Sequence, residues 1–183
     1  RTNVTGSFMH NFALIGGAVY APGIRNSKIS AVFVNNTALI GGAVNTNLIN
    51  NTEIESYFIN NTADLNLMEL IDDNTKEDIE EYLNEYVDEK ILKYILNYTM
   101  EHEMGLGFGG GIAVAGIVLN SNITGEFTNN GGADAGGAIS VLGVVENVLI
   151  SGHFEGNHAG LDGALFLPVV KDSTIADSFA SNY

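Results

Sequence analysis

The sequence predicts an all-β solenoid, a right-handed parallel β-helix of about 25 residues per coil, with one α-helical insertion. The first observation behind this prediction is a phenylalanine that occurs six times at regular spacing with an asparagine three residues after it. The second is a glycine pair that follows the phenylalanine at a constant distance. The third is one long break in the repeat that carries helical spacing instead. A fixed period of this size is typical of solenoids, in which each repeat buries its apolar side against its neighbours.

The repeated phenylalanines follow one another at intervals of 25, 25, 69, 27 and 25. The long interval exceeds an ordinary one by about 44 residues, so one repeat carries an insertion of that length. We expect the phenylalanine rings to form an inward column, each contributing roughly 1.5–3 kcal/mol of burial. We expect the asparagines to form a ladder that satisfies backbone groups of the turn, because an amide both donates and accepts. The two sets are Phe8, Phe33, Phe58, Phe127, Phe154 and Phe179, and Asn11, Asn36, Asn61, Asn130, Asn157 and Asn182.

A glycine pair and an aliphatic residue complete the repeat. The pairs provide either backbone conformations closed to other residues or a close approach between chains. They are followed by a β-branched residue, usually two positions after Ser or Thr. The pairs with their next residue are Gly16-Gly17-Ala18, Gly41-Gly42-Ala43, Gly110-Gly111-Ile112, Gly136-Gly137-Ala138 and Asp162-Gly163-Ala164, and the aliphatics are Ile29, Ile54, Ile123, Ile150 and Ile175.

Short segments within the repeat have the pattern of strands. Ser30–Val34, Ala43–Val44 and Val148–Gly152 alternate apolar and polar residues or are β-branched, and Asn, Gly and Ser bound them. A repeat of about 25 residues accommodates three short strands and three turns. Stacked coils would then place equivalent residues about 4.8 Å apart, and the crossover rule favours a right-handed coil.

The insertion, from Leu65 to Gly109, has a different character. It contains twelve Asp or Glu against three Lys, and its apolar residues recur at intervals of four. This spacing predicts one helix over Lys76 to Glu103. Either the apolar stripe of this helix packs on the solenoid wall, or the helix recognises a partner through its acidic, Tyr-rich surface, or it serves as an end-cap or self-association element. The candidate partner contacts on the helix are Tyr82, Tyr86, Tyr94 and Tyr98.

Composition excludes several classes of function. The formal net charge is −15, with only seven Lys and Arg, which argues against binding to nucleic acid or to anionic membranes. The chain has no cysteine, so disulfides and thiolate zinc sites are excluded. No apolar run reaches membrane-spanning length, so we expect no direct membrane insertion. The repeat runs to both ends of the chain, and we expect this single domain, residues 1–183, to be a fragment of a longer solenoid.

Catalysis is an alternative function, because β-helices also host polysaccharide lyases and hydrolases. Polysaccharide lyases and hydrolases need paired carboxylates, or a carboxylate–calcium site beside a basic residue. The best candidates are Asp134 and Asp162, but in repeat register they are offset, and the basic residues of the solenoid lie elsewhere. No two histidines have metal-ligand spacing. We therefore expect no catalytic residues, no metal site and no cofactor. The basic residues are Arg1, Arg25, Lys28 and Lys171, and the histidines are His10, His102, His153 and His158.

The paired motifs, Phe-x-x-Asn followed by Gly-Gly-Ala-aliphatic, resemble the repeats of the chlamydial polymorphic outer-membrane proteins. They equally resemble those of the adhesin-like surface proteins of methanogenic archaea. The resemblance covers residues 1–64 and 110–183 but not the insertion. It implies a cell-surface β-helix used for attachment, with no catalytic residues to carry over. The Asn-, Asp- and Ile-rich, Arg-poor composition favours the archaeal group. Ile112 in place of Ala and Asp162 in place of Gly depart from the pattern.

Together these observations predict a non-catalytic adhesin segment at the cell surface or outside the cell. Its partner would be a protein or glycan on a host or neighbouring cell. The alternatives are a carbohydrate-active β-helix and a structural subunit that assembles end to end. Triplets of the form Asn-x-Ser/Thr are compatible with a glycosylated exterior. They begin at Asn3, Asn35, Asn50, Asn60, Asn97 and Asn122.

Overall fold

The computed structural model describes residues 2–63, 81, 85, 107–132 and 134–183. These residues form a parallel β-solenoid of about five turns. The strands, in chain order, are β1 (Asn3–Met9), β2 (Val19–Ala21), β3 (Ile24–Arg25), β4 (Lys28–Val34), β5 (Thr37–Ala38), β6 (Val44–Asn50), β7 (Glu53–Ile59), β8 (Thr62–Ala63), β9 (Ile112–Thr128), β10 (Gly131–Gly132), β11 (Ile139–Val141), β12 (Val144–Glu155), β13 (Leu165–Phe166), β14 (Val169–Lys171), β15 (Thr174–Ile175) and β16 (Ser178–Ala180).

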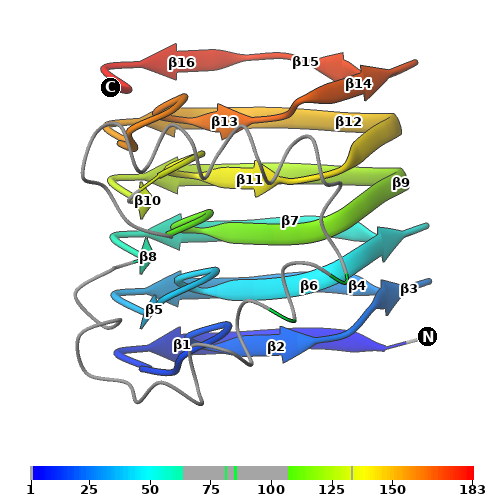
Figure 1. The fold of residues 1–183 in the computed structure, drawn as a ribbon. Coiled ribbons are helices and arrows are strands. Elements are labelled where there is room, and N and C mark those ends of the chain that lie inside the picture. The colour runs from blue at the N-terminus through cyan, green and yellow to red at the C-terminus, as the bar shows by residue number, and fades with distance from the viewer. Residues whose placement is uncertain (1, 64–80, 82–84, 86–106, 133) are drawn as a thin grey trace.

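The coils lie on one another as successive layers, from the N-terminus at one end of the stack to the C-terminus at the other (Figure 1). One face is a sheet in which β1, β4, β7, β9 and β12 follow one another and all pair in parallel. We call its outward side the long face. A second wall joins β2 and β3 to β6, and β6 to β9. A smaller sheet, β5–β8–β10, forms the third side.

The predicted column of aromatic rings is confirmed. Each repeated phenylalanine pairs in register with the next, and successive ring centroids are 4.7–5.0 Å apart with nearly parallel planes. The four inner rings, Phe33, Phe58, Phe127 and Phe154, are completely buried. Beside them runs the predicted aliphatic column, in which Ile29, Ile54, Ile123 and Ile150 are also buried. These two columns form much of the core and make neighbouring coils mutually dependent.

The asparagine ladder is confirmed as well. In each step, the side-chain and backbone N–H groups of one asparagine donate to the Oδ1 of the asparagine in the next coil, at 2.7–3.1 Å. The same side chain also donates to the backbone oxygen of a repeated phenylalanine. The ladder therefore satisfies buried backbone groups that would each cost about 1–3 kcal/mol if left unpaired.

Both predicted roles of the glycine pair are confirmed: the first glycine has a conformation that other residues rarely adopt, and the second allows a close approach between chains. The first glycine adopts the left-handed conformation, with φ near 60° at Gly16, Gly41 and Gly136. Asp162 takes this position with φ 52°, which Asp tolerates better than most residues. At the second glycine, a Cβ would collide with the backbone of the adjacent coil; the Cβ of Gly17 would lie 2.1 Å from the oxygen of Gly42.

The structure corrects the assignment of the third glycine pair. The left-handed residue there is Gly109, with φ 61°, so the pair is Gly109-Gly110. Ile112 does not replace Ala, because it pairs with Val44 and Ile139, one position further along each repeat. Gly111 stands at the Ala position instead. Three consecutive glycines made the register ambiguous by one residue in the sequence.

The predicted helix from Lys76 to Glu103 falls almost entirely outside the described residues. Within it only Glu81 and Glu85 are described; both have helical backbone and exposed side chains. Two isolated residues do not define a helix, so the described residues do not show the predicted helical insertion. The end of the inserted segment is clearer, because Phe108 bridges Ile40 and Ala135 and is fully buried. Phe108 and Gly109, which the sequence placed in the insertion, thus belong to the solenoid.

Candidate functional site

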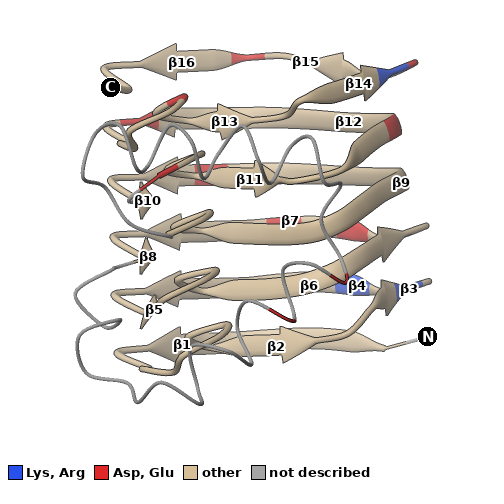
Figure 2. Cartoon of the chain, in the orientation of Figure 1, with Lys and Arg blue, Asp and Glu red and all other residues tan. Residues whose placement is uncertain are grey.

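The candidate site lies on the long face, where strands β4, β7, β9 and β12 turn alternate side chains outward. Along β7 the alternation is complete: Glu53, Glu55 and Tyr57 are exposed, while Ile54 and Phe58 point into the core. Charged residues are sparse along the described coils (Figure 2). Polar and charged groups that gather on this face are therefore distinctive.

A row of asparagines marks the corner at which the chain enters this face. Asn26, Asn51, Asn120 and Asn147 all have φ between 48° and 54°, a left-handed conformation that Asn adopts more readily than most residues. Asn51 donates its amide to Asn26 at 2.7 Å, and Asn147 donates to Asn120 at 2.8 Å. Between these pairs, Asn120 donates to Asn50 at 3.4 Å, next to a register shift between β6 and β9. This exposed row is thus a second, less regular amide ladder.

A hydroxyl group stabilises the turn that follows three of these asparagines, and also the turn that follows Asp172 on the last coil. Ser27, Thr52, Ser121 and Ser173 each donate to the backbone oxygen two residues earlier, at 2.6–3.0 Å. The Ser121 hydroxyl also accepts the Thr52 N–H of the neighbouring coil at 3.0 Å. This explains why Ser or Thr so often precedes the buried aliphatic residue by two positions.

Lys28 occupies the long face just after this corner. Its ammonium lies 3.3 Å from carboxylate oxygens of both Glu53 and Glu55. The hydrogen bonds with Glu53, and next with Glu55, raise the pKa of Lys28 above its ordinary value. All three side chains are substantially exposed, so this triad contributes little to stability. It neutralises part of the negative charge of the long face.

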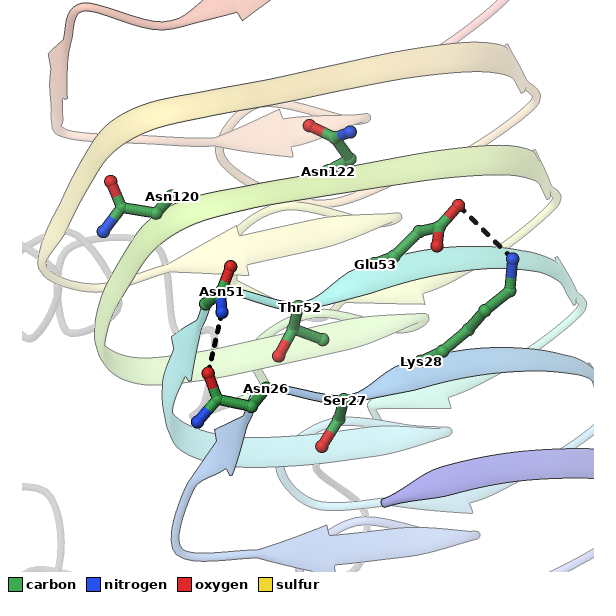
Figure 3. A pocket seen from close by; sticks show the side chains of 8 residues that line it. All are labelled: Asn26, Ser27, Lys28, Asn51, Thr52, Glu53, Asn120 and Asn122. Atoms are coloured by element: carbon green, nitrogen blue, oxygen red, sulfur yellow. Dashed lines mark hydrogen bonds and ion pairs between the residues drawn. The ribbon is translucent and has the colours of Figure 1, made fainter. Parts of the chain in front are cut away.

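Two open grooves lie among these side chains. The corner groove has a volume of about 570 Å³, and its polar lining is shown in Figure 3. The dashed contacts there join Asn51 to Asn26 and Glu53 to Lys28. The corner groove is lined by Asn26, Ser27, Lys28, Asn51, Thr52, Glu53, Asn120 and Asn122.

The face groove lies further along the same strands and has a volume of about 550 Å³. It differs from the corner groove in containing an exposed aromatic ring, that of Tyr57, which is 53% exposed. In register, Tyr57 is flanked by Val32 on one side and Glu126 on the other. The face groove is lined by Ser30, Glu55, Ser56, Tyr57, Thr124, Gly125, Glu126, Gly152 and His153.

The sequence did not single out the face groove. The insertion separates Tyr57 from Glu126 along the chain and hides their shared position in the repeat. Applying the phenylalanine register would have aligned them, since each immediately precedes a repeated phenylalanine. The outward position of Tyr57 was also readable from the alternation in β7.

The two carboxylates tested for catalysis are not brought together as a pair. Asp134 is completely buried, and its Oδ2 accepts the Gly107 N–H at 2.5 Å. Its Oδ1 has no hydrogen-bond partner among the described residues. Burial raises the pKa of Asp134 to about 7, although the Gly107 hydrogen bond acts in the opposite direction. Asp162, by contrast, is exposed on a left-handed turn of the next coil.

The other residues considered from sequence are dispersed. His10 sits on an exposed left-handed turn, His153 lies 2.9 Å from Glu155, and His158 stacks on Tyr183 with ring centroids 5.7 Å apart. Across residues 2–63, 107–132 and 134–183, no three His, Asp or Glu side chains are grouped as metal ligands would be. His102 lies outside the described residues.

The tyrosines proposed as partner contacts on the insertion also lie outside the described residues. They are Tyr82, Tyr86, Tyr94 and Tyr98.

Comparison with known proteins adds no family: no family model, no curated protein and no solved structure matches the chain. Among the described residues, no helix is both long and apolar enough to cross a membrane.

Proposed function

We propose that this chain is a non-catalytic segment of an extracellular adhesin, which attaches a cell to a protein or glycan on another surface. In this proposal the solenoid is a right-handed β-helix of about 25 residues per coil. Within the inserted segment, Lys76 to Glu103 forms an acidic, tyrosine-bearing helix. The resemblance of the repeat to cell-surface attachment proteins supports this proposal.

The observation that carries the proposal is the difference between the interior and the outer surface of the coil. Inside, stacked rings and a buried amide ladder specify one rigid register over the described coils. Outside, the long face presents open polar grooves and an exposed tyrosine. A rigid scaffold with a preformed polar face is well suited to recognition, because little ordering entropy is lost on binding.

The test is attachment of beads coated with the whole chain to candidate cells and to a glycan array. We expect specific binding that a variant lacking residues 64–106 reduces, because that variant loses the proposed helical contact. Binding unchanged by the deletion would place the contact on the solenoid faces. Absence of binding by the intact chain to every cell and glycan would contradict the adhesin proposal.

The carbohydrate-active alternative has less support. A glycosidase or lyase needs a pair of acidic groups open to substrate, whereas Asp134 is enclosed and only Asp162 is exposed. A screen of the chain against acidic polysaccharides, with Asp134→Ala and Asp162→Ala as controls, separates the two functions. Turnover that either substitution abolishes would overturn the non-catalytic proposal.

A further inference from the structure

We propose that the face groove binds a neutral, hydroxyl-rich glycan, with the ring of Tyr57 as a stacking platform and Glu55 and Glu126 as hydrogen-bond acceptors. This inference rests on the proposed function and narrows its partner to one chemical class and one site. Four features of the groove carry it: an interrupted strand pair, a floor of glycine backbone, an exposed aromatic ring, and carboxylates that already have partners.

The groove lies where the pairing of β4 with β7 is interrupted. Ile29 pairs with Ile54 and Val32 pairs with Tyr57, but the two residues between them have no partners in register on β7. The hydroxyl of Ser56 fills this gap: it accepts the Ala31 N–H and donates to the Ile29 oxygen, both at 3.2 Å. A side chain therefore replaces direct strand pairing at this point, and the local geometry of the face departs from a flat sheet.

Glycine continues this departure into the next two coils. Gly125 and Gly152 follow Ser56 in register, with φ of 141° and 133°. A Cβ at Gly125 would lie 1.8 Å from the Ser56 oxygen, and one at Gly152 would lie 2.0 Å from the Gly125 oxygen. Only glycine fits at these two positions. Both glycines line the groove, so part of its floor is formed by backbone without side chains.

Tyr57 stands beside this floor and remains 53% exposed. A half-exposed aromatic ring on a rigid strand offers a flat apolar surface together with a polar hydroxyl group. A sugar ring has the complementary form, with an apolar face of C–H groups and a rim of hydroxyls. Ser30 and Thr124 add hydroxyl groups within reach of such a rim. This combination of one aromatic surface with a few polar groups is common in small-molecule sites.

The charges of the groove favour a neutral ligand over an ionic one. Glu55 is held 3.3 Å from Lys28, Glu126 accepts the Thr128 hydroxyl at 3.3 Å, and Glu155 lies 2.9 Å from His153. Each of these carboxylates therefore already has a hydrogen-bond or ion-pair partner, and Lys28 offsets the charge of Glu55. Anionic polysaccharides are disfavoured by these same carboxylates and by the net charge of −15. Hydroxyl groups can still donate to the remaining carboxylate lone pairs.

The test is native electrophoresis of the whole chain through gels that contain a soluble neutral polysaccharide, using glucan, xylan, mannan and galactan in turn. Titration calorimetry with oligosaccharides of the retarding polymer then measures the affinity. We expect Tyr57→Ala to weaken binding at least about tenfold, because the stacking surface is lost. We expect Tyr57→Phe to stay within about threefold, because it keeps the ring.

Tyr20→Ala is the matched control. Tyr20 is 48% exposed and lies on β2, away from the groove, so its removal should leave glycan affinity unchanged. Circular dichroism confirms that each variant keeps its β structure. Glycan binding should also persist at high salt, whereas an oligolysine peptide bound through the carboxylates would dissociate.

Three results would overturn the groove assignment. They are no retardation of the intact chain in any neutral polysaccharide, equal binding by Tyr57→Ala and the intact chain, and salt-sensitive binding of oligolysine in place of glycan. Cell attachment separates this inference from the proposed function. If beads coated with Tyr57→Ala still attach to cells and the same variant binds glycan as tightly as the intact chain, the groove assignment is refuted and the adhesin proposal stands. Glycan binding in gels without any cell attachment refutes the adhesin proposal instead.

Discussion

The side-chain amide of Asn61 donates to the Oδ1 of Asn130 at 3.0 Å, although 69 residues of chain separate the two. The backbone N–H of Asn61 donates to the same oxygen at 3.0 Å, and Phe58 stacks on Phe127 with centroids 4.9 Å apart. The coils before and after the inserted segment are therefore direct neighbours, joined by the same contacts as any other pair. The insertion leaves the solenoid without interrupting it.

This continuity predicts that the insertion can be removed. A variant in which a short Gly-Ser linker replaces residues 64–106 should fold to the same solenoid, because β8 and Phe108 keep their partners on both sides. We expect the circular dichroism spectrum of this variant to keep the β-sheet signal of the solenoid, and its thermal unfolding to be cooperative. A loss of cooperative unfolding in this variant would show that the inserted segment is part of the solenoid core.

The buried amide ladder predicts a large cost for removing one step. Asn130→Ala leaves the N–H of Asn61 and the oxygen of Phe58 without these hydrogen bonds. We expect a loss of about 2–5 kcal/mol in the free energy of unfolding, measured by urea denaturation. Asn147→Gly is the matched control in the exposed ladder, where φ is 54° and glycine fits. It should cost less than about 1 kcal/mol. Equal losses in both variants would contradict the assigned difference between the two ladders.

The stacked rings predict a dependence on position along the column. Phe58 is fully buried between Phe33 and Phe127, so Phe58→Ala should cost about 3–5 kcal/mol. Phe179 stacks on Phe154 at the end of the described column and is 44% exposed. Phe179→Ala should therefore cost about half as much or less. Denaturation midpoints of the two variants, compared at equal slopes, test this order, and a reversed order would be incompatible with the buried column.

Asp134 predicts a specific dependence of stability on pH. Burial raises the pKa of Asp134 in the folded state to about 7, from an ordinary value of 3.8. Folding therefore favours the protonated acid. The contribution of Asp134 to the free energy of unfolding is fully present below about pH 4 and is lost as the pH rises through about 7. Above that pH the folded protein holds a buried carboxylate. Asn cannot ionise and keeps an oxygen for the Gly107 N–H, so Asp134→Asn should remove this loss.

The measurement is the free energy of unfolding of both proteins at pH 4.5 and pH 8. The difference between them cancels the contributions of the other carboxylates. We expect the variant to gain roughly 1–4 kcal/mol relative to the parent on going to pH 8. A difference between the two proteins that does not change with pH would mean that Asp134 is not buried in its charged form at pH 8.

The sequence by itself determined the solenoid, because a solenoid is built from contacts between identical positions. Phe58 and Asn61 meet residues of their own kind in neighbouring coils, so the spacing of the repeat already states which residues pack together. The glycine pair was equally readable, since few residues accept a left-handed turn or a backbone oxygen at 2.1 Å from the Cβ position. The exact register was harder, because three successive glycines left the third pair ambiguous by one residue.

Only the tertiary structure decided what the outer surface brings together. The face groove depends on Ser56 replacing strand pairing and on glycine conformations in two later coils, neither of which has a signal in local sequence. The environment of Asp134 was equally hidden, because its burial arises beside Gly107, 27 residues earlier, at the point where the chain rejoins the solenoid. The sequence repeat specifies the interior, because equivalent residues of neighbouring coils contact one another there. On the exterior, different residues from separate coils lie side by side, and only the folded solenoid brings them together.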